Sequence, residues 1–323
     1  MSEPKLSIII PTYNRREILL RTLEGYSRQT ALGGILEVLV VDDGSTDGTG
    51  AAVVASRQAS AIPIRYLREE NKGLAAARNY GIREARGELL LFGDDDIIPG
   101  PTLVAEHIAW NHSHPEPTSA ILGCVTWSPE MNPTPFMEWL GLEGVLFGFG
   151  HLFPGKEVPF DHSYFCNTSV KRNFLVERGM FDEEFRAYGF EDIELSYRLF
   201  NQGFRVLYNP KALGYHYKRM TYADVCRRAE LVIAASELFE SKEAGKYLKE
   251  LRSRRGLLST KRKIIRGLAK FIAPFVAPLT PVLDTQISLP KEVYRAIYHC
   301  LVVPRAQKKI ESSKILRQYP NWA

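Results

Sequence analysis

Short apolar runs alternate with amphipathic helical patterns through the first hundred residues, and this alternation constrains the fold more than any other feature. Each apolar run has the length of a buried strand, and the segments between them carry apolar residues at helical spacing. Strands that alternate with helices form βαβ units, in which a mostly parallel sheet has helices on both faces. The predicted fold is therefore α/β. We expect strands at residues 6–10, 36–41, 62–67 and 88–92, and helices at residues 15–29, 49–59 and 74–85.

The later part of the chain has a less regular pattern. Residues 123–155 are rich in Pro, Gly, Trp and Phe without a clear period, which predicts loops and short helices. Further along, the pattern predicts strands at residues 161–170 and 204–208 and helices at residues 191–201 and over residues 221–254.

Charge is distributed unevenly along the 323 residues. From Ser241 onward there are 18 Lys and Arg against 5 Asp and Glu, whereas the preceding residues carry 24 against 32. An acidic body suits a metal site, and a basic end suits anionic lipid or another polyanion. We therefore predict one domain over residues 1–235 and a basic, amphipathic helical extension over residues 236–323.

The extension combines clustered cations at residues 261–270 with an almost uncharged stretch at residues 268–283. That stretch is shorter than the roughly 20 residues needed to span a bilayer, and three prolines interrupt it. We expect it to lie in the interface of an anionic membrane, joined by the amphipathic residues 292–303. The alternative is a helical subdomain packed on the body. Nucleic-acid binding is not expected, because Tyr294 and Tyr298 fall at helix packing positions.

The four cysteines, Cys124, Cys166, Cys226 and Cys300, lie far apart without the spacing of a zinc or redox pair. We interpret them as reduced thiols. The N-terminus has no basic stretch followed by a long apolar run, so no signal peptide is expected. The predicted location is the cytoplasm, at the cytoplasmic face of a membrane.

Ligands on parallel α/β sheets bind beyond the carboxyl ends of the strands, which here are followed by polar residues. The strongest signal is Asp94-Asp95-Asp96, because three consecutive carboxylates repel one another unless a cation neutralises them. Asp94 and Asp96 are expected to share a side, and their hard oxygens suit Mg²⁺ or Mn²⁺, which would also hold a diphosphate. The alternative is a solvated acidic turn.

Two other strand ends carry candidate nucleoside ligands. After the first strand, Tyr13 could stack on a base and Thr12 could hydrogen-bond it, although Asn14 could simply cap the next helix. After the second strand, Asp43 could accept a hydrogen bond from a base or a ribose, or could form part of a turn. Lys72 and Arg78 flank a helix start that would favour a diphosphate; the alternative is a solvated basic face.

Three acidic or titratable residues later in the chain could take part in the chemistry. Asp192, beside Glu191, could accept the proton of an attacking sugar hydroxyl. The alternative is that both carboxylates merely stabilise the start of a helix. His216, flanked by aromatic residues, could contact metal or phosphate, or could be a packed residue. Tyr188 and Phe190 could form an apolar wall beside a sugar.

Seven segments of the chain, in this order, resemble the family 2 glycosyltransferases with a GT-A fold. Each segment is short, but the ordered set is specific, and it covers about residues 5–220. The segments are SIIIPTYNR, EVLVVDDGSTDGT, NKGLAAARNYGI, GELLLFGDDD, CNTSVKRNFL, GMFDEEFRAYGFEDIELSYRL and GFRVLYNP.

The resemblance implies roles for individual residues. Asp94 and Asp96 match the outer positions of the DxD motif, with Asp96 the firmer metal ligand and Asp94 toward the ribose or the metal. Asp192 matches the acidic base of the ED motif, with Glu191 orienting it or binding acceptor, and His216 matches a position that contacts metal or diphosphate in some relatives. The implied nucleoside ligands are Pro11, Thr12, Tyr13 and Asp43, and the rest of the expected donor-binding set is Lys72, Arg78 and Asp95.

The function predicted from these observations is metal-dependent transfer of a hexose-type unit from a nucleotide sugar, with UDP as the expected nucleotide. The acceptor would be a hydroxyl of a glycan or lipid-linked precursor in envelope or cell-surface polysaccharide synthesis, and the resemblance implies inversion. Gly93, where relatives often have an apolar residue, is expected to widen the sugar pocket. One alternative is a sugar nucleotidyltransferase, which the glycine-free PTYNRRE disfavours. The other is a catalytically silent scaffold that binds nucleotide sugar at a membrane.

Overall fold

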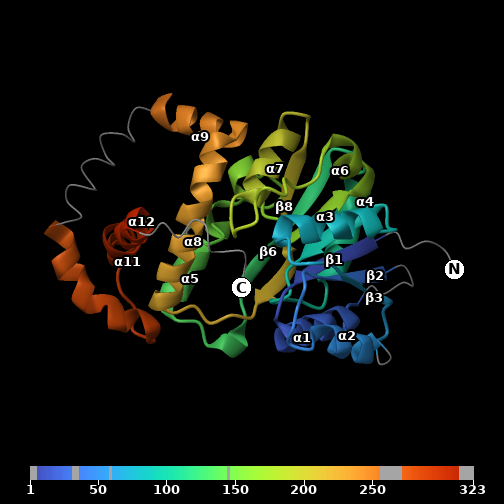
Figure 1. The fold of residues 1–323 in the computed structure, drawn as a ribbon, viewed down its shortest axis with the longest axis horizontal. Helices are drawn as coiled ribbons and strands as arrows, with labels where there is room; N and C mark the ends of the chain where they lie inside the picture. Colours follow the sequence, from blue (N-terminus) through green and yellow to red (C-terminus); the bar gives the residue numbers. More distant parts are fainter. Residues whose placement is uncertain (1–5, 31–35, 58–59, 144–145, 255–270, 313–323) are drawn as a thin grey trace.

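The computed structural model describes residues 6–30, 36–57, 60–143, 146–254 and 271–312, and its fold is shown in Figure 1. All seven elements expected in the first hundred residues are present, each within a few residues of its expected bounds. They are β1 (Leu6–Thr12), α1 (Arg16–Ser27), β2 (Leu36–Asp42), α2 (Thr49–Arg57), β3 (Ile64–Arg68), α3 (Leu74–Glu84) and β4 (Leu89–Gly93).

One eight-stranded sheet runs through the molecule in the order β3-β2-β1-β4-β7-β6-β8-β5. Its first half, β3-β2-β1-β4, is parallel throughout. In the second half β7 is antiparallel to both β4 and β6, and β6 is parallel to β8. The α/β prediction is therefore confirmed, with a mixed sheet. The strands of the second half are β5 (Ile97–Pro99), β6 (Ser119–Trp127), β7 (Asn167–Lys171) and β8 (Arg205–His216).

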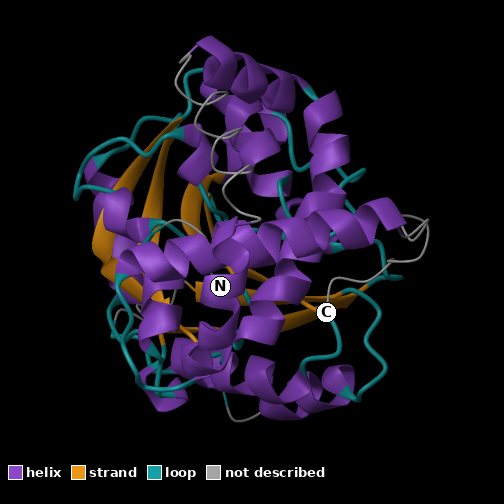
Figure 2. Ribbon diagram, turned by 90° about the vertical axis from the view of Figure 1, so that its left-hand side faces the viewer, coloured by secondary structure: helices purple, strands orange, loops and turns teal. Residues whose placement is uncertain are grey.

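Two hydrophobic cores lie on opposite faces of this sheet, because successive strand residues point to opposite sides. Ile8 and Ile10 of β1 share one core with residues of α1, α2 and α4 (Leu103–Ser113). Ile9 shares the other with residues of α3, α6 (Arg172–Arg178) and α7 (Glu191–Phe200). Figure 2 shows helices on both sides of the strands.

The sequence pattern was wrong about all four strands in the second half, and it did not predict β5. β6 lies partly within the stretch expected to form loops, and its pairing with β8 shifts register after Gly123. A side chain at Gly123 of β6 would collide with the Asn167 amide of β7 and the Ala212 carbonyl of β8. Both neighbouring strands approach β6 closely at this position, so a glycine is required there, and this glycine interrupted the strand pattern in the sequence. The strand expected at residues 161–170 begins only at Asn167, and the one expected at residues 204–208 continues to His216.

The remaining helices lie beside the second half of the sheet and in the C-terminal extension. They are α5 (Pro135–Leu142), α8 (Tyr222–Ser241), α9 (Glu243–Arg254), α11 (Lys291–Ile297) and α12 (Val303–Ser312). Segments of 3₁₀ helix lie at Pro129–Met131, Phe149–His151, Phe160–His162 and Ala277–Asp284, and a π-helical segment lies at Tyr298–Val302. The boundary expected at residue 235 falls within α8.

The described part of the extension packs on the body, with α11 and α12 beside α5 and α8 (Figure 1). Tyr294 and Ile297 of α11 share a hydrophobic core with Trp139 of α5 and Val225 of α8. Ion pairs flank this core, since Lys291 and Arg295 both contact Glu143 and Lys309 contacts Glu230. The basic stretch at residues 261–270 lies outside the described residues. Within the described ranges, every helix is too short or too polar to cross a membrane.

Candidate active site

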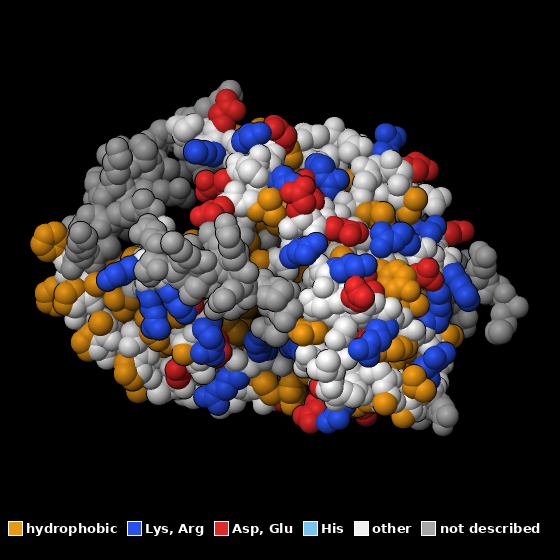
Figure 3. All heavy atoms as spheres, in the orientation of Figure 1, with side chains coloured by type: hydrophobic (Ala, Val, Ile, Leu, Met, Phe, Trp, Pro, Cys, Tyr) orange, Lys and Arg blue, Asp and Glu red, His pale blue; other side chains and the backbone are white. Residues whose placement is uncertain are grey.

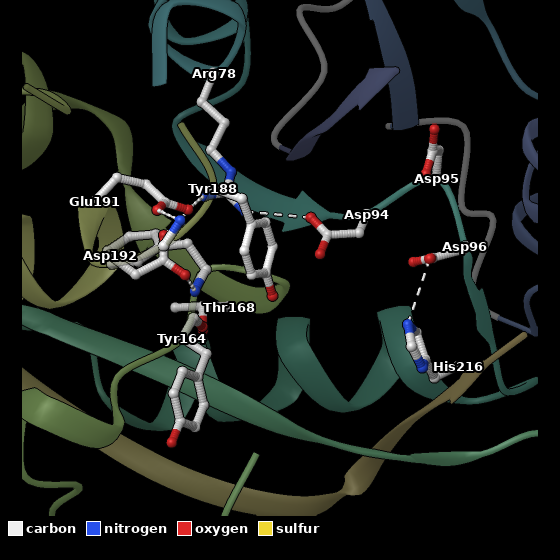
Figure 4. A network of polar contacts seen from close by, with 12 residues as sticks. Arg78, Asp94, Asp95, Asp96, Tyr164, Thr168, Tyr188, Glu191, Asp192 and His216 are labelled. Carbon is white, nitrogen blue, oxygen red and sulfur yellow. Dashed lines mark hydrogen bonds and ion pairs between the residues drawn. The ribbon is translucent and has the colours of Figure 1, made fainter. Parts of the chain in front are cut away.

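The acidic triplet forms a turn between β4 and β5, at the carboxyl-terminal edge of the parallel strands. β4 ends at Gly93, and the N–H of Ile97 donates to the carbonyl of Asp94 over 3.2 Å. Figure 4 shows the carboxylates of Asp94 and Asp96 directed to the same side and that of Asp95 directed away from it. The two outer carboxylates therefore face one space, as the sequence predicted, although a turn and not an extended strand places them there.

Asp95 ties this turn to β1 and α1. Its carboxylate accepts a hydrogen bond from the Thr12 hydroxyl at 2.8 Å, and its carbonyl accepts one from the Thr22 hydroxyl at 2.7 Å. Burial raises the pKa of the Asp95 carboxyl to about 7, although Arg15 lies 3.4 Å away and opposes this shift. Thr12 and Asp95 thus form a buried structural contact, and their contact with a donor stays a prediction.

Asp96 lies beside His216, because β5 pairs with β8 and sets Ile97 opposite His216. One oxygen of Asp96 is 3.3 Å from His216 Nε2 and 2.6 Å from Arg15 Nη2. Burial alone would raise the pKa of this carboxyl, but His216 and Arg15 together hold it well below its usual range. Asp96 is therefore an anion in this site.

The pair Asp96 and His216 suits a divalent cation, since Mn²⁺ accepts both carboxylate oxygen and imidazole nitrogen. The Nδ1 atom of His216 is buried without a hydrogen-bond partner, which leaves Nε2 as the nitrogen turned to Asp96. Among the described residues, no three or more His, Cys, Asp or Glu side chains lie together as a group that could hold a metal ion.

Glu191 and Asp192 begin α7 and follow a residue with an uncommon backbone conformation. Phe190 has a φ of +73°, which bulky residues rarely adopt, and its ring stacks on Phe239 of α8 with 4.6 Å between centroids. The Asp192 carboxylate accepts a hydrogen bond from the N–H of Phe165 at 3.0 Å. Burial, with the neighbouring Asp192, raises the pKa of Glu191 to about 7.

Arg78 of α3 joins these carboxylates to the acidic turn. Its Nη1 lies 2.7 Å from Asp192 Oδ1 and 3.2 Å from Glu191 Oε1, and its Nη2 lies 3.2 Å from Asp94 Oδ1. Burial raises the pKa of Asp94 to about 6 against the pull of this guanidinium. The sequence suggested that Arg78 contacts a diphosphate, whereas the structure surrounds it with carboxylates.

The residues expected to hold the nucleoside lie around the ends of β1 and β2. Asp43 is fully buried, and its two oxygens accept hydrogen bonds from the backbone N–H groups of Lys72 and Gly73 at 2.7 and 2.9 Å. It thereby anchors the loop that leads into α3. Pro11 is buried within β1, Tyr13 is half-buried, and the side chain of Lys72 is exposed. Nucleoside contact by these residues stays a prediction.

Three features of the site were not expected from the sequence. Arg15 was expected only to begin a helix, yet it contacts Asp96. Its position directly after PTYN, at the end of β1, is the sequence feature that could have placed it in the site. Tyr188 lies under the guanidinium of Arg228 from α8, 4.5 Å from the ring centroid, and stands beside the carboxylates (Figure 4). Phe190 stacks on Phe239 of α8. Gly93 leaves no added room, because a Cβ there would lie 2.6 Å from the Tyr26 hydroxyl.

Comparison with known sequences gives extensive but partial matches. Residues 7–166 match Glycosyl transferase family 2. Validoxylamine A glucosyltransferase of Streptomyces hygroscopicus subsp. limoneus is 37% identical over 223 residues, which cover 62% of this chain and 49% of that protein. Chondroitin synthase of Escherichia coli is 27% identical over 241 residues, which cover 65% and 34% of the two chains. The chain thus spans about half the length, or less, of these relatives.

Two solved structures are similar over nearly the whole chain. A mannosyltransferase from Pyrobaculum calidifontis, in complex with GDP-Man and Mn²⁺, superposes with a TM-score of 0.62 and 21% identity, covering 97% of this chain and 89% of that one. Residues 1–349 of TarS from S. aureus, in complex with UDP, give a TM-score of 0.54 and 19% identity over 94% and 92%.

These likenesses place the mixed sheet and its flanking helices in the GT-A class of α/β folds. Within that class the chain belongs to glycosyl transferase family 2. The family that the ordered motifs indicated is therefore confirmed.

Proposed function

We propose that this chain transfers a sugar from a nucleotide-sugar donor, with UDP as the expected nucleotide, to an acceptor hydroxyl in a metal-dependent reaction. The proposal is carried by one observation: the buried Arg78 connects Asp94, on the donor side, to Glu191 and Asp192 in one network of ion pairs. The carboxylates expected to serve donor and acceptor therefore belong to a single site. The nucleotide sugar and Mn²⁺ of the mannosyltransferase and the UDP of TarS support this choice of donor and cofactor.

Asp192 is the proposed general base. An acceptor hydroxyl must lose its proton as its oxygen attacks the anomeric carbon, and a positioned carboxylate can accept that proton. The two oxygens of Asp192 accept hydrogen bonds from Phe165 N–H and from Arg78, at 3.0 and 2.7 Å. Together the two bonds fix the plane of the carboxylate. Direct attack from the side opposite the leaving nucleotide inverts the anomeric centre, as expected for this family.

Asp96 and His216, with Asp94 beside them, are the residues that would hold Mg²⁺ or Mn²⁺. A bound divalent cation stabilises the charge that develops on the leaving diphosphate. Arg15 would support metal binding, because its ion pair with Asp96 keeps that carboxylate ionised and fixed in place.

A donor screen that measures release of UDP, GDP or dTDP, with and without Mn²⁺, tests the proposal. We expect Asp192→Asn to lower kcat by about 10²–10⁴-fold with nucleotide binding retained, and Asp96→Ala to abolish metal-dependent donor binding. Glu177→Gln, an exposed carboxylate elsewhere, should behave as wild type. Nucleotide binding without release from any donor would instead favour a catalytically silent binding protein.

We also propose that the extension docks on an anionic membrane surface at the cytoplasmic face, where it would bring the site to a glycan or lipid-linked acceptor. Phe271 and Phe275, one helical turn apart, are 73% and 80% exposed, and Ile287 is 59% exposed. Figure 3 shows hydrophobic side chains along this edge of the molecule with Lys and Arg near them. Apolar anchors flanked by cations are typical of interfacial binding.

Flotation with vesicles of phosphatidylcholine and anionic lipid tests this surface. Truncating the extension would uncover the core that it shares with α5 and α8, so point substitutions are the cleaner perturbation. Phe271→Ser with Phe275→Ser should abolish flotation, since each phenylalanine contributes about 1.5–3 kcal/mol on burial. Phe153→Ser, at a phenylalanine on the body that is 70% exposed, is the matched control. Equal flotation of the two variants would refute the docking surface.

A further inference from the structure

Arg78 is the only arginine or lysine that is buried in the described part of the chain. It projects from α3 toward Asp94, Glu191 and Asp192. The ring of Phe181 lies 5.2 Å from its guanidinium carbon. A buried cation is costly unless charged partners surround it. Its three carboxylate partners come from two separate segments, the turn after β4 and the start of α7.

The two terminal nitrogens of Arg78 serve different sides of the site. Nη1 contacts both carboxylates of α7, Asp192 and Glu191, and Nη2 contacts Asp94. A planar guanidinium can hold groups on two sides in a fixed relative orientation, whereas a lysine ammonium is a single point charge on a flexible stem. The planar guanidinium of Arg78 therefore sets the position of Asp192 relative to Asp94.

We propose that Arg78 is a positioning residue, which orients the general base Asp192 against the donor-side carboxylate Asp94, and that it does not bind the donor diphosphate. The role of Asp192 in this statement rests on the function proposed above. Arg78 acts through the two carboxylates and touches no reacting atom.

The burial of Arg78 argues against a direct contact with the donor. Its side chain is 2% exposed, both terminal nitrogens are engaged by carboxylates, and the remaining Nε is buried without a partner. A diphosphate could reach the guanidinium only by displacing one of these carboxylates. That exchange would leave a buried anion without its cation, which is unfavourable.

The charge balance explains why the base depends on this residue. One guanidinium faces three carboxylates, so the network already carries excess negative charge. Without Arg78, mutual repulsion among the three carboxylates would turn the Asp192 side chain away from its present position. That change would take the base out of its working geometry, and misplacement by about 1 Å can cost about 100-fold in rate.

Kinetics of Arg78→Lys test the positioning role. We expect kcat to fall by about 100-fold, while the donor KM and the affinity for UDP measured by calorimetry stay within about threefold of wild type. Arg83→Lys on the same helix, at an arginine that is 49% exposed, should leave all three values unchanged. Loss of UDP affinity with kcat retained at saturating donor would overturn the proposal and make Arg78 a diphosphate ligand.

A double-variant cycle followed by thermal unfolding tests the contact between Arg78 and Asp192 without any assay of activity. Arg78→Met should lower Tm, because it leaves one buried and two partly buried carboxylates uncompensated. Adding Asp192→Asn should recover part of that loss, because it removes one of the repelling charges. Additive losses in the double variant would refute the contact. If wild type transferred no sugar but the double variant recovered stability, the result would count against the proposed function alone. The contact between Arg78 and Asp192 would still stand.

Discussion

Replacing Gly93 with alanine distinguishes two explanations for this glycine. If Gly93 widened the sugar pocket, Gly93→Ala would alter donor binding and leave stability unchanged. In the structure the added Cβ would instead meet the Tyr26 hydroxyl at 2.6 Å, while the next atoms, Tyr26 Cζ and Ile10 Cγ1, lie at 3.7 and 4.0 Å. Only the hydroxyl oxygen is closer than an ordinary van der Waals contact.

The expected loss of stability in Gly93→Ala follows from this single overlap with the Tyr26 hydroxyl. Tyr26 is 2% exposed and packed between α1 and the sheet, so its ring has little room to retreat. Overpacking of a core by one methyl group costs about 1–3 kcal/mol, and we expect Gly93→Ala to destabilise the protein by about 2 kcal/mol. Tyr26→Phe removes the clashing oxygen, so in that background the alanine should cost less than about 0.5 kcal/mol.

A double-variant cycle in urea measures the coupling between the two positions. The four proteins are wild type, Gly93→Ala, Tyr26→Phe and the pair, and the donor KM of each is measured in parallel. We expect a coupling energy of about 1.5 kcal/mol in favour of the pair. An equal cost of the alanine in both backgrounds, or a change in donor KM without a change in stability, would refute this packing explanation.

Three further predictions concern the segments that hold the base. The pKa of Glu191 is raised from its usual 4.5 to about 7, so the folded state binds this proton more tightly than the unfolded chain, and stability is lost as pH rises through that window. Glu191→Gln should therefore gain about 3 kcal/mol relative to wild type between pH 4.5 and 7.5 in urea titrations, and parallel stability curves would contradict this. Asn79→Ala should cost about 2–3 kcal/mol, because the Asn79 amide bonds both the N–H and the carbonyl of Phe181 at 2.9 Å; a Tm equal to that of wild type would exclude it. Phe239→Ala should cost about 3 kcal/mol and also lower kcat, because it removes the ring that supports Phe190; a stability loss with kcat unchanged would show that the base does not depend on this stacking.

The first half of the fold could be read from the sequence because each of its strands and helices carries a regular apolar pattern of its own. Each strand from β1 to β4 is followed by the helix or turn that covers or ends it, and the pattern of apolar residues records which face is buried. The same logic predicts that Thr12, Asp43 and Asp94 lie together at the carboxyl ends of parallel strands. β6 and the full length of β8 were missed because their pairing depends on partners far along the chain, and β6 contains a glycine that the close approach of β7 and β8 demands.

The sequence by itself determined an α/β domain with an acidic rim, a pair of carboxylates at the start of a later helix, and a basic C-terminal extension, because apolar period and residue type are local properties. Only the tertiary structure decided which charges meet. It paired Arg78 with Asp94, Glu191 and Asp192, paired Arg15 and His216 with Asp96, and laid the described part of the extension on α5 and α8. The physical reason is that an ion pair depends on the distance between side chains in space, and residue spacing along the chain does not contain that distance until the sheet and its helices are packed.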